Sequence, residues 1–246
     1  MVIIEMEVRK LSHDPTELIT RAVQPALWLL VFGQVFGRFR ATGNIDYKDF
    51  IAPGILAQSV LFIAIFYGIS IIWERDLGIV HKFLVTPTPR AALVLGKALS
   101  AGVRGLSQVI IIYALSAISG VNINWNPLHI LSVAFIVILG ASFFSTLSLV
   151  IACLVKTRER FMGIGQLITM PLFFASNAIY PINLMPMWLK VIARINPLTY
   201  EVDALRGLML AGGTTTYGFA VDLTVLFVAM VIMIALGSWL YPNVVR

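Results

Sequence analysis

Long apolar runs without charge constrain this chain more than any other feature. Only 12% of its 246 residues are charged, whereas about 25% is typical of a soluble domain. A helix needs roughly 20 apolar residues to cross a hydrocarbon core about 30 Å thick. Because the runs are continuously apolar and do not alternate, helices are favoured over barrel strands.

The runs therefore predict an all-α integral membrane protein, with residues 1–246 forming a single transmembrane domain. Six spans are expected, and the limits of the spans are placed where lysine or arginine flanks an apolar run. Lys97 and Arg104 interrupt the start of the third run, so its membrane part is placed after residue 101. The six spans lie at about 22–39, 51–73, 102–121, 128–155, 161–180 and 220–241.

Lysine and arginine also predict the orientation, since loops rich in them stay in the cytoplasm. With both termini inside, eleven of these residues lie on the cytoplasmic side and six outside, and Arg104 is left unassigned. We therefore expect a multi-pass protein of a prokaryotic cell membrane with both termini in the cytoplasm. We also expect it to contact membrane lipid and to bind no nucleic acid.

The spans lack the groups that ion-coupled carriers use. Such carriers bury ionisable side chains near the membrane midplane to bind the coupling ion. No acidic residue lies near the middle of any of the six runs, and Arg104 is interpreted as reaching back to the cytoplasmic headgroups. This pattern opposes a secondary transporter and favours a source of energy outside the chain.

The sequence also lacks the motifs of a metal site or an ATPase. Cys153 is the only cysteine, and the three histidines are far apart in the sequence, so no metal site is expected. The "GKA" at Gly96–Ala98 lacks both the Ser or Thr after lysine and the earlier glycine of a phosphate-binding loop. We expect no cofactor in this chain and no enzyme activity of its own.

The stretch "WERDLGIVHKFLVTPTPR", from Trp73 to Arg90, is unusually charged and patterned for a loop. Leu77, Val80 and Leu84 recur at helical spacing, with acidic residues at the start of the stretch and Lys82 nearer its end. The prolines of "TPTPR" then end the helix. The pattern predicts a short amphipathic helix across the cytoplasmic face, or a helix that merely floats on the membrane surface.

The segment after the fifth run predicts two more short helices on the outer side. One covers Met187–Ile195, and Asn196 caps the next, which has Pro197 at its first position. Trp188 and Tyr200 suit the headgroup belt. These helices are either re-entrant at the outer leaflet or part of a surface-lying loop.

Gly33 and Gly37 form a GxxxG motif in the first run, which permits close approach of two helices. The motif suits a dimer contact and packing inside one chain equally well.

Two blocks of sequence carry a resemblance to a known family. The first, "WERDLGIVHKFLVTPTPRAALVLGK", resembles the cytoplasmic segment of type-2 ABC exporter permeases, and Asp76 departs from many relatives. The second, "YPINLMPMWLKVIARINPLTYEVDALRGLML", resembles the outer segment of the drug-exporter and nodulation-factor-exporter branch. The residues that match the first block are Glu74, Arg75, Gly78, Thr86, Pro87, Arg90, Gly96 and Lys97.

The resemblance implies a permease dimer, presumed to be a homodimer, that binds two copies of a separate ABC ATPase, which holds ATP and Mg. The cytoplasmic segment would be its coupling helix, built from Glu74, Arg75, Asp76, Gly78, Lys82, Thr86, Pro87 and Arg90. The outer segment would form a gate that includes Pro181, Pro186, Trp188, Asn196, Pro197, Tyr200 and Arg206. In relatives the first span helps form the dimer seam, which suggests a dimer contact for Gly33 and Gly37.

The implied activity is ATP-driven export of a hydrophobic or amphipathic substrate: a drug, a lipid or a lipid-linked glycan. Two alternatives remain at this point. One is an ion-coupled secondary transporter, and the other is a membrane assembly protein that transports nothing.

Overall fold

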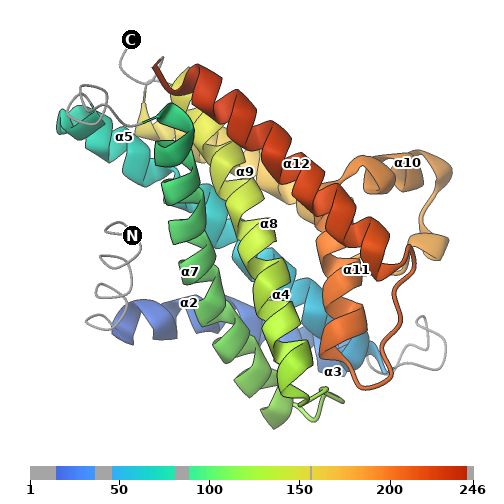
Figure 1. The fold of residues 1–246 in the computed structure, drawn as a ribbon. Helices are drawn as coiled ribbons and strands as arrows, with labels where there is room; N and C mark the ends of the chain where they lie inside the picture. The colour runs from blue at the N-terminus through green and yellow to red at the C-terminus, as the bar shows by residue number, and fades with distance from the viewer. Residues whose placement is uncertain (1–14, 37–45, 81–88, 156, 243–246) are drawn as a thin grey trace.

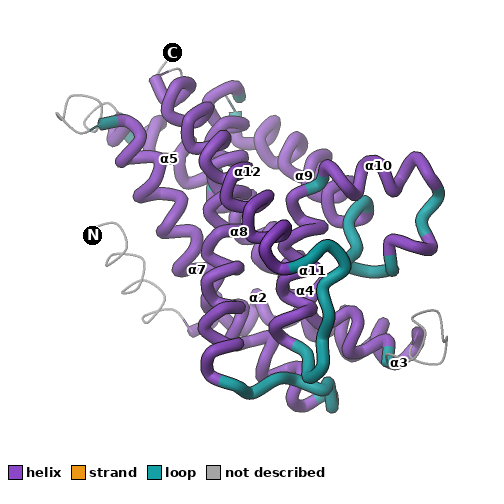
Figure 2. Tube along the Cα trace, turned by 45° about the vertical axis from the view of Figure 1, so that its right-hand side comes forward, coloured by secondary structure: helices purple, strands orange, loops and turns teal. Residues whose placement is uncertain are grey.

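The computed structural model describes residues 15–36, 46–80, 89–155 and 157–242, which are mostly helical (Figures 1 and 2). In the first half of the chain the elements are α2 (Pro15–Leu27), the π-helix η1 (Trp28–Phe32), α3 (Gly33–Phe36), α4 (Tyr47–Tyr67), α5 (Ile69–Asp76) and α7 (Arg90–Ile118). The second half contains α8 (Pro127–Leu154), α9 (Arg158–Phe174), the 3-10 helix η2 (Ile182–Leu184), α10 (Met187–Ile195), α11 (Pro197–Met209) and α12 (Phe219–Leu240).

Within these residues, four helices are long and apolar enough to cross a membrane. They are the continuous pair α4–α5, then α7, α8 and α12, and they run side by side through the molecule in Figure 1. The predicted class, an all-α integral membrane protein, is confirmed. The remaining two predicted spans correspond to shorter helices, so the count of six stays a prediction.

The predicted fourth and sixth spans agree with α8 and α12 to within a residue or two. The third begins earlier than predicted, because α7 runs unbroken from Arg90. Its two cations do not interrupt it, since Lys97 pairs with Glu74 and Arg104 stacks on Tyr67.

The fifth predicted span ends too late, because α9 stops at Phe174. The Ser176 hydroxyl donates to the Phe173 carbonyl at 2.7 Å and accepts from the Ala178 amide at 3.3 Å. These local bonds offer the backbone an alternative to another helical turn. The chain from 175 to 180 therefore bends instead of continuing the helix.

A single residue, Gly68, separates α4 from α5 within the second span. A Cβ at this position would lie 1.9 Å from the Ser148 hydroxyl oxygen and 2.9 Å from the Phe161 ring. Only glycine lets the backbone come this close to α8 and α9. The charged last turn of α5 then forms ion pairs with Lys97 of α7 and Arg158 of α9.

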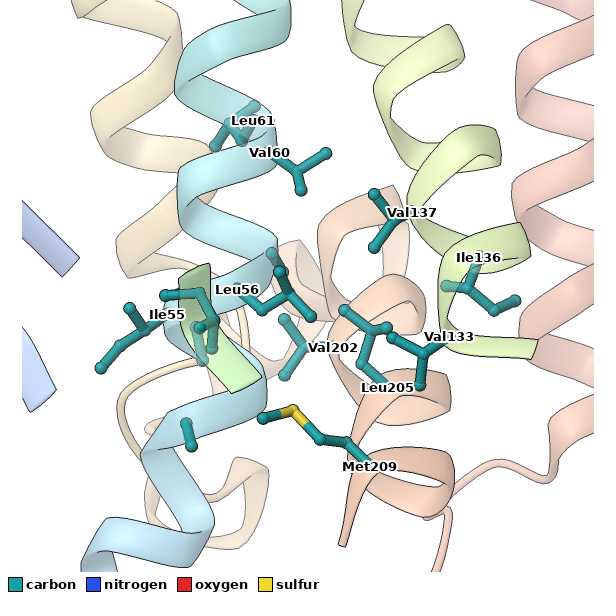
Figure 3. Packing of buried hydrophobic residues seen from close by; sticks show 14 of the residues in the cluster. Ile55, Leu56, Val60, Leu61, Val133, Ile136, Val137, Val202, Leu205 and Met209 are labelled. Carbon is teal, nitrogen blue, oxygen red and sulfur yellow. The ribbon is translucent and has the colours of Figure 1, made fainter. Parts of the chain in front are cut away.

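The main core lies where α11 fits between α4 and α8. Figure 3 shows the apolar side chains of these three helices meeting in one cluster. The labelled members are Ile55, Leu56, Val60 and Leu61 of α4, Val133, Ile136 and Val137 of α8, and Val202, Leu205 and Met209 of α11. Although α11 is only 13 residues long, it is part of the bundle core.

Two parts of the structure depart from the bundle direction. The segment of α2, η1 and α3 crosses behind α7 and α4 in Figure 1, and α10 projects from the side of the bundle in both views. The outward face of α10 carries exposed apolar side chains, among them Met187 and Ile195, each 76% exposed.

Candidate functional site

The predicted coupling segment begins differently from the prediction. Glu74, Arg75 and Asp76 were expected to lead a new helix, but they form the last turn of α5. The helix ends there because Gly78 adopts a left-handed backbone with φ of +69°, a conformation that costs other residues free energy. The charges therefore belong to the second span itself.

Glu74 pairs with a residue inside its own chain. The Nζ of Lys97 on α7 lies 2.5 Å from Oε2 of Glu74, and the lysine side chain is only 7% exposed. A buried ammonium is costly without such a partner. This bond fixes the end of α5 to the first half of α7.

Asp76 makes the second link, to the start of α9. Its carboxylate lies 2.9 Å from an Nη atom of Arg158, whose guanidinium also stacks 4.2 Å from the Trp73 ring. Arg75 donates to the Val155 carbonyl at 3.3 Å, at the turn between α8 and α9. We call the six residues Trp73, Glu74, Arg75, Asp76, Lys97 and Arg158 the cytoplasmic clamp, after the side of the membrane on which the sequence predicts them.

The other predicted coupling residues are less defined. Lys82, Thr86 and Pro87 lie outside the described residues, and Arg90 is the exposed first residue of α7. Their contact with an ATPase stays a prediction.

Gly33 lies at the start of α3, where a Cβ would be 3.1 Å from the Lys48 side chain of α4. The close approach is therefore to another helix of the same chain. Gly37 lies outside the described residues, and a role of the motif in dimerisation stays a prediction.

The two outer helices are confirmed as helices. Asn196 caps α11 by accepting from the Leu198 amide at 3.0 Å, and Pro197 is the first residue of that helix. The Asn196 amide also donates to the Leu172 carbonyl of α9 at 2.6 Å. One buried side chain thus joins α9, α10 and α11.

The remaining predicted gate residues differ in their surroundings. Trp188 is 65% exposed on α10, Pro186 precedes that helix and is exposed, and Pro181 precedes η2. Tyr200 donates from its hydroxyl to the Arg194 carbonyl at 2.6 Å. Their action as a gate stays a prediction.

Arg206 is buried on α11, where it faces α4 and the bend after α9. It donates to the Asn177 carbonyl at 2.8 Å and to the Phe50 carbonyl at 3.4 Å, and its guanidinium lies 4.0 Å from the Phe50 ring. The nearest acid is Asp203, one turn earlier on α11, at 4.0 Å. Arg206 therefore ties α11 to α4 and to the bend after α9.

Sequence reasoning missed Asp203, which is fully buried. Its two oxygens accept from the Thr216 amide at 2.6 Å, the Thr216 hydroxyl at 2.9 Å and the Tyr217 amide at 3.0 Å. These bonds hold the loop that leads from α11 into α12. The spacing of Asp203 and Arg206, one helical turn apart, was the signal for such a cluster.

Sequence reasoning also missed Glu201, which lies outside all six predicted spans but packs against the long apolar helix α8. A Cβ at Gly140, halfway along α8, would lie 2.3 Å from the Glu201 carboxyl, which is fully buried. Among the described residues neither carboxyl oxygen has a hydrogen-bond partner. Burial raises the pKa of Glu201 well above its ordinary value, because removal from water disfavours the charged carboxylate.

The physical reason is that α11 re-enters the bundle and carries its acid against the middle of α8. Asp222, in the first turn of α12, is likewise fully buried, and its oxygens have no partner in the described part of the chain. The apolar runs of the sequence do not indicate that either acid is buried.

A pocket of about 390 Å³ lies between α2, α4 and α7. Its lining is Thr20, Gln24, Pro25, Gln58, Ser59, Phe62, Ile63, Phe66, Tyr67, Arg104 and Gln108. Side-chain amides and one guanidinium thus lie beside aromatic rings. A pocket of this size and mixed lining suits a small amphipathic molecule.

Arg104 is placed differently from the prediction that it reaches the cytoplasmic headgroups. It lies halfway along α7, about 21 Å from the helix start at 1.5 Å per residue. Its guanidinium lies 4.6 Å from the Tyr67 ring, and the residue is 9% exposed. The charge is held deep inside the bundle, at the wall of the pocket.

The fold and these sites define a helical membrane permease, and comparison with known proteins identifies its family. The model of the family described as "ABC-2 type transporter" matches residues 1–210. The chain therefore belongs to the ABC-2 type transporter family and is a transport permease. Membership implies an ABC ATPase as partner, and the related permeases are not enzymes themselves.

Three relatives illustrate the match. The ycf38 protein of Cyanophora paradoxa, named as a transport permease, is 29% identical over 213 residues, which cover 83% of this chain and 72% of the relative. The daunorubicin resistance ABC transporter permease protein DrrB1 of Streptomyces coeruleorubidus is 25% identical over 80% of this chain and 70% of its own length. Nodulation protein J of Rhizobium leguminosarum bv. trifolii is 26% identical over 78% and 74%.

Proposed function

We propose that this chain is the permease subunit of an ATP-driven exporter, which moves a hydrophobic or amphipathic substrate outward across the cell membrane. The observation that carries the proposal is the cytoplasmic clamp. Glu74 and Asp76 join the end of the second span to α7 and to the start of α9 at 2.5 and 2.9 Å. A push on the segment that follows Asp76 would reach three helices at once.

The clamp suits a moving part because its pairs differ in burial. The carboxylate of Asp76 and the guanidinium of Arg158 are 40% and 42% exposed, so breaking their pair costs little free energy. The pair of Glu74 with Lys97 is more buried and so resists separation. A push by the ATPase would therefore rotate α5 about the buried pair while the exposed pair separates.

The substrate class follows from the pocket between α2, α4 and α7. Aromatic and amide side chains side by side accept molecules that have both an apolar body and a polar group. DrrB1 is named for daunorubicin resistance, which agrees with a drug as cargo. A lipid and a lipid-linked glycan belong to the same chemical class.

The proposed assembly is a homodimer of this chain with two copies of a separate ATPase, which binds ATP and Mg. Both termini lie in the cytoplasm of a prokaryotic cell, and the clamp faces the ATPase. The outer segment of Pro181 to Arg206 forms the outer gate, because it joins α9, α10, α11 and α4 through Asn196 and Arg206.

Glu201 favours a second candidate, ion-coupled transport. A buried protonated carboxyl against the middle of a spanning helix is the kind of group that binds a coupling proton. In that case export would follow the proton gradient and not the ATP supply. We rank this function second because the family match implies an ABC ATPase.

The test is purification of the tagged chain from its own membranes, followed by transport in inverted vesicles. We expect a copurified ATPase with a phosphate-binding loop and no ATP hydrolysis by the permease alone. We expect uptake of daunorubicin to require ATP and to continue when a proton ionophore is present. Uptake that the ionophore abolishes and that does not depend on ATP would establish the second candidate instead. Absence of any copurified ATPase would also contradict the proposal.

A further inference from the structure

Helix α10 has a wide apolar face that no other described part of the chain covers. Five of its apolar side chains are 47% to 76% exposed, and they are Met187, Trp188, Val191, Ile192 and Ile195. At about 100° per residue of an α-helix, these five positions form one continuous arc of the helix surface. The fully buried Ala193 lies on the opposite side, which packs on the rest of the chain. The apolar arc therefore points away from the bundle, from which α10 projects in Figures 1 and 2.

Two cations lie along one edge of this arc. Lys190 and Arg194 are four residues apart, so their side chains are neighbours on the helix surface. Arg194 is exposed and Lys190 is half-buried. The ion pairs found among the described residues involve neither of them. Like charges one turn apart repel each other and destabilise a helix, so an anion bound between them would remove an unfavourable interaction.

The arc and the two cations together indicate the chemistry of the molecule that covers them. A free anion would neutralise Lys190 and Arg194 but would leave the apolar arc uncovered. A purely apolar molecule would cover the arc but would leave the two charges unbalanced. A phospholipid carries a phosphate and two acyl chains in one molecule, and the helices that can span a membrane place lipid around this chain. Basic side chains beside an apolar helix face are typical of helices that bind phospholipid.

We propose that α10 binds a phospholipid, whose phosphate lies between Lys190 and Arg194 and whose acyl chains lie along the apolar arc. Asn196, directly after α10, donates to the Leu172 carbonyl of α9 and caps α11. The lipid would therefore anchor the joint between these helices. The site goes beyond the proposed function, because lipid binding requires neither ATP nor transport, and only its meaning for the outer gate rests on that function.

The experiment uses the full chain in dodecyl maltoside micelles, whose uncharged headgroups contain no phosphate. The probe is a phosphatidylglycerol that carries a diazirine on one acyl chain, and mass spectrometry maps the labelled peptides after illumination. We expect label at residues 187–195, and we expect excess unlabelled phosphatidylglycerol to suppress it. Dioleoylglycerol, which has acyl chains but no phosphate, and inorganic phosphate, which has no chains, should each leave the label in place.

Three results would overturn the proposal. Equal suppression by dioleoylglycerol would mean that the cations have no part in binding. Suppression by inorganic phosphate alone would mean that the site takes a free anion and not a lipid. Absence of label from α10 would mean that another protein surface, such as a second copy of the chain, covers the arc.

Variants separate the charges from the apolar arc. Lys190→Gln and Arg194→Gln should each lower the labelling of α10 about fivefold, because each removes one of the two charges that hold the phosphate. Lys190→Arg keeps the charge and should retain most of the labelling. Arg160→Gln, at an exposed cation of α9, is the matched control and should label like the unaltered protein. Full labelling of a variant that lacks both Lys190 and Arg194 would also overturn the proposal.

The outcomes distinguish this inference from the proposed function. Phosphate-dependent labelling of α10 in a chain whose complex shows no ATP-dependent export would support the lipid site and reject the exporter. ATP-dependent export without such labelling would leave the exporter in place and reject the lipid site.

Discussion

The two ends of the molecule handle charge in opposite ways. At the end of α5, Asp76 and Arg158 form a pair in which each side chain is at least 40% exposed. Around α11, Glu201, Asp203 and Asp222 are fully buried. Exposed pairs contribute little to stability, whereas removing one member of a buried set costs about 3 to 5 kcal/mol. The difference suggests a fixed region around α11 and an exposed contact at the end of α5 that can be exchanged.

The largest effect on folding is expected at Asp203. Asp203→Ala removes three hydrogen bonds to the loop before α12 and leaves Arg206 buried without its nearest acid. We expect a loss of about 3 to 5 kcal/mol in the free energy of unfolding, measured by thermal unfolding in detergent. Asp46→Ala is the control, because this exposed N-cap of α4 makes only a 3.4 Å bond and should cost about 1 kcal/mol. Similar losses at both positions would remove the contrast between buried and exposed acids.

Glu201→Gln sharpens the comparison because it should stabilise the protein as pH rises, whereas Asp203→Ala destabilises it. The pKa of Glu201 is raised in the folded chain, so the native state keeps a proton that the unfolded chain releases as pH rises through the ordinary carboxyl range. The native protein therefore loses stability with rising pH, by about 1.4 kcal/mol for each unit through which the two pKa values differ. Glutamine carries no such proton. We expect the variant to gain midpoint temperature over the unaltered protein between pH 4 and pH 8, and a constant difference would contradict the buried, protonated state.

Asn196→Ala tests the joint between α9 and α11. The variant loses the bond to the Leu198 amide and the bond to the Leu172 carbonyl, which should cost about 1 to 2 kcal/mol. Asn183→Ala on the exposed η2 is the comparison and should leave the midpoint unchanged. Thermal unfolding of both variants decides whether the outer half depends on this side chain.

The effect on stability expected at Gly78 is no larger than that at Asn196. Among the described residues alanine there meets no neighbouring atom within 4 Å, so its cost is only that of the left-handed backbone, about 1 to 2 kcal/mol. Gly163→Ala on α9 also meets open space but has no such backbone, and it should stabilise by up to about 1 kcal/mol. If both variants behave alike in thermal unfolding, the turn after α5 is not held as described.

Local signals in the sequence predicted local structure well. The Asn196 cap and the helices at 187–195, 128–155 and 220–241 follow from capping and apolar length, and all appear in the structure. The end of α5 at Asp76 depends on the backbone of one glycine, which the helical spacing of its neighbours masks.

Contacts between distant segments could not be predicted in the same way. The burial of Glu201 depends on the return of α11 to the middle of α8, and the depth of Arg104 depends on where α7 begins. Apolar run length does not encode either fact. Glu74 and Lys97 both match the family pattern in the sequence, but nothing in that pattern predicts that their side chains pair.

The central claim is that the cytoplasmic clamp links the ATPase to the spans, and charge exchange tests it most directly. The measurement is ATP-dependent daunorubicin uptake per ATP hydrolysed in inverted vesicles that contain the complete complex. Glu74→Lys and Lys97→Glu each place like charges at a contact of 2.5 Å, and each should lose most of the coupling. The double variant restores opposite charges and should recover a large part of it. Unaltered coupling in both single variants, with normal insertion and ATPase binding, would contradict the account.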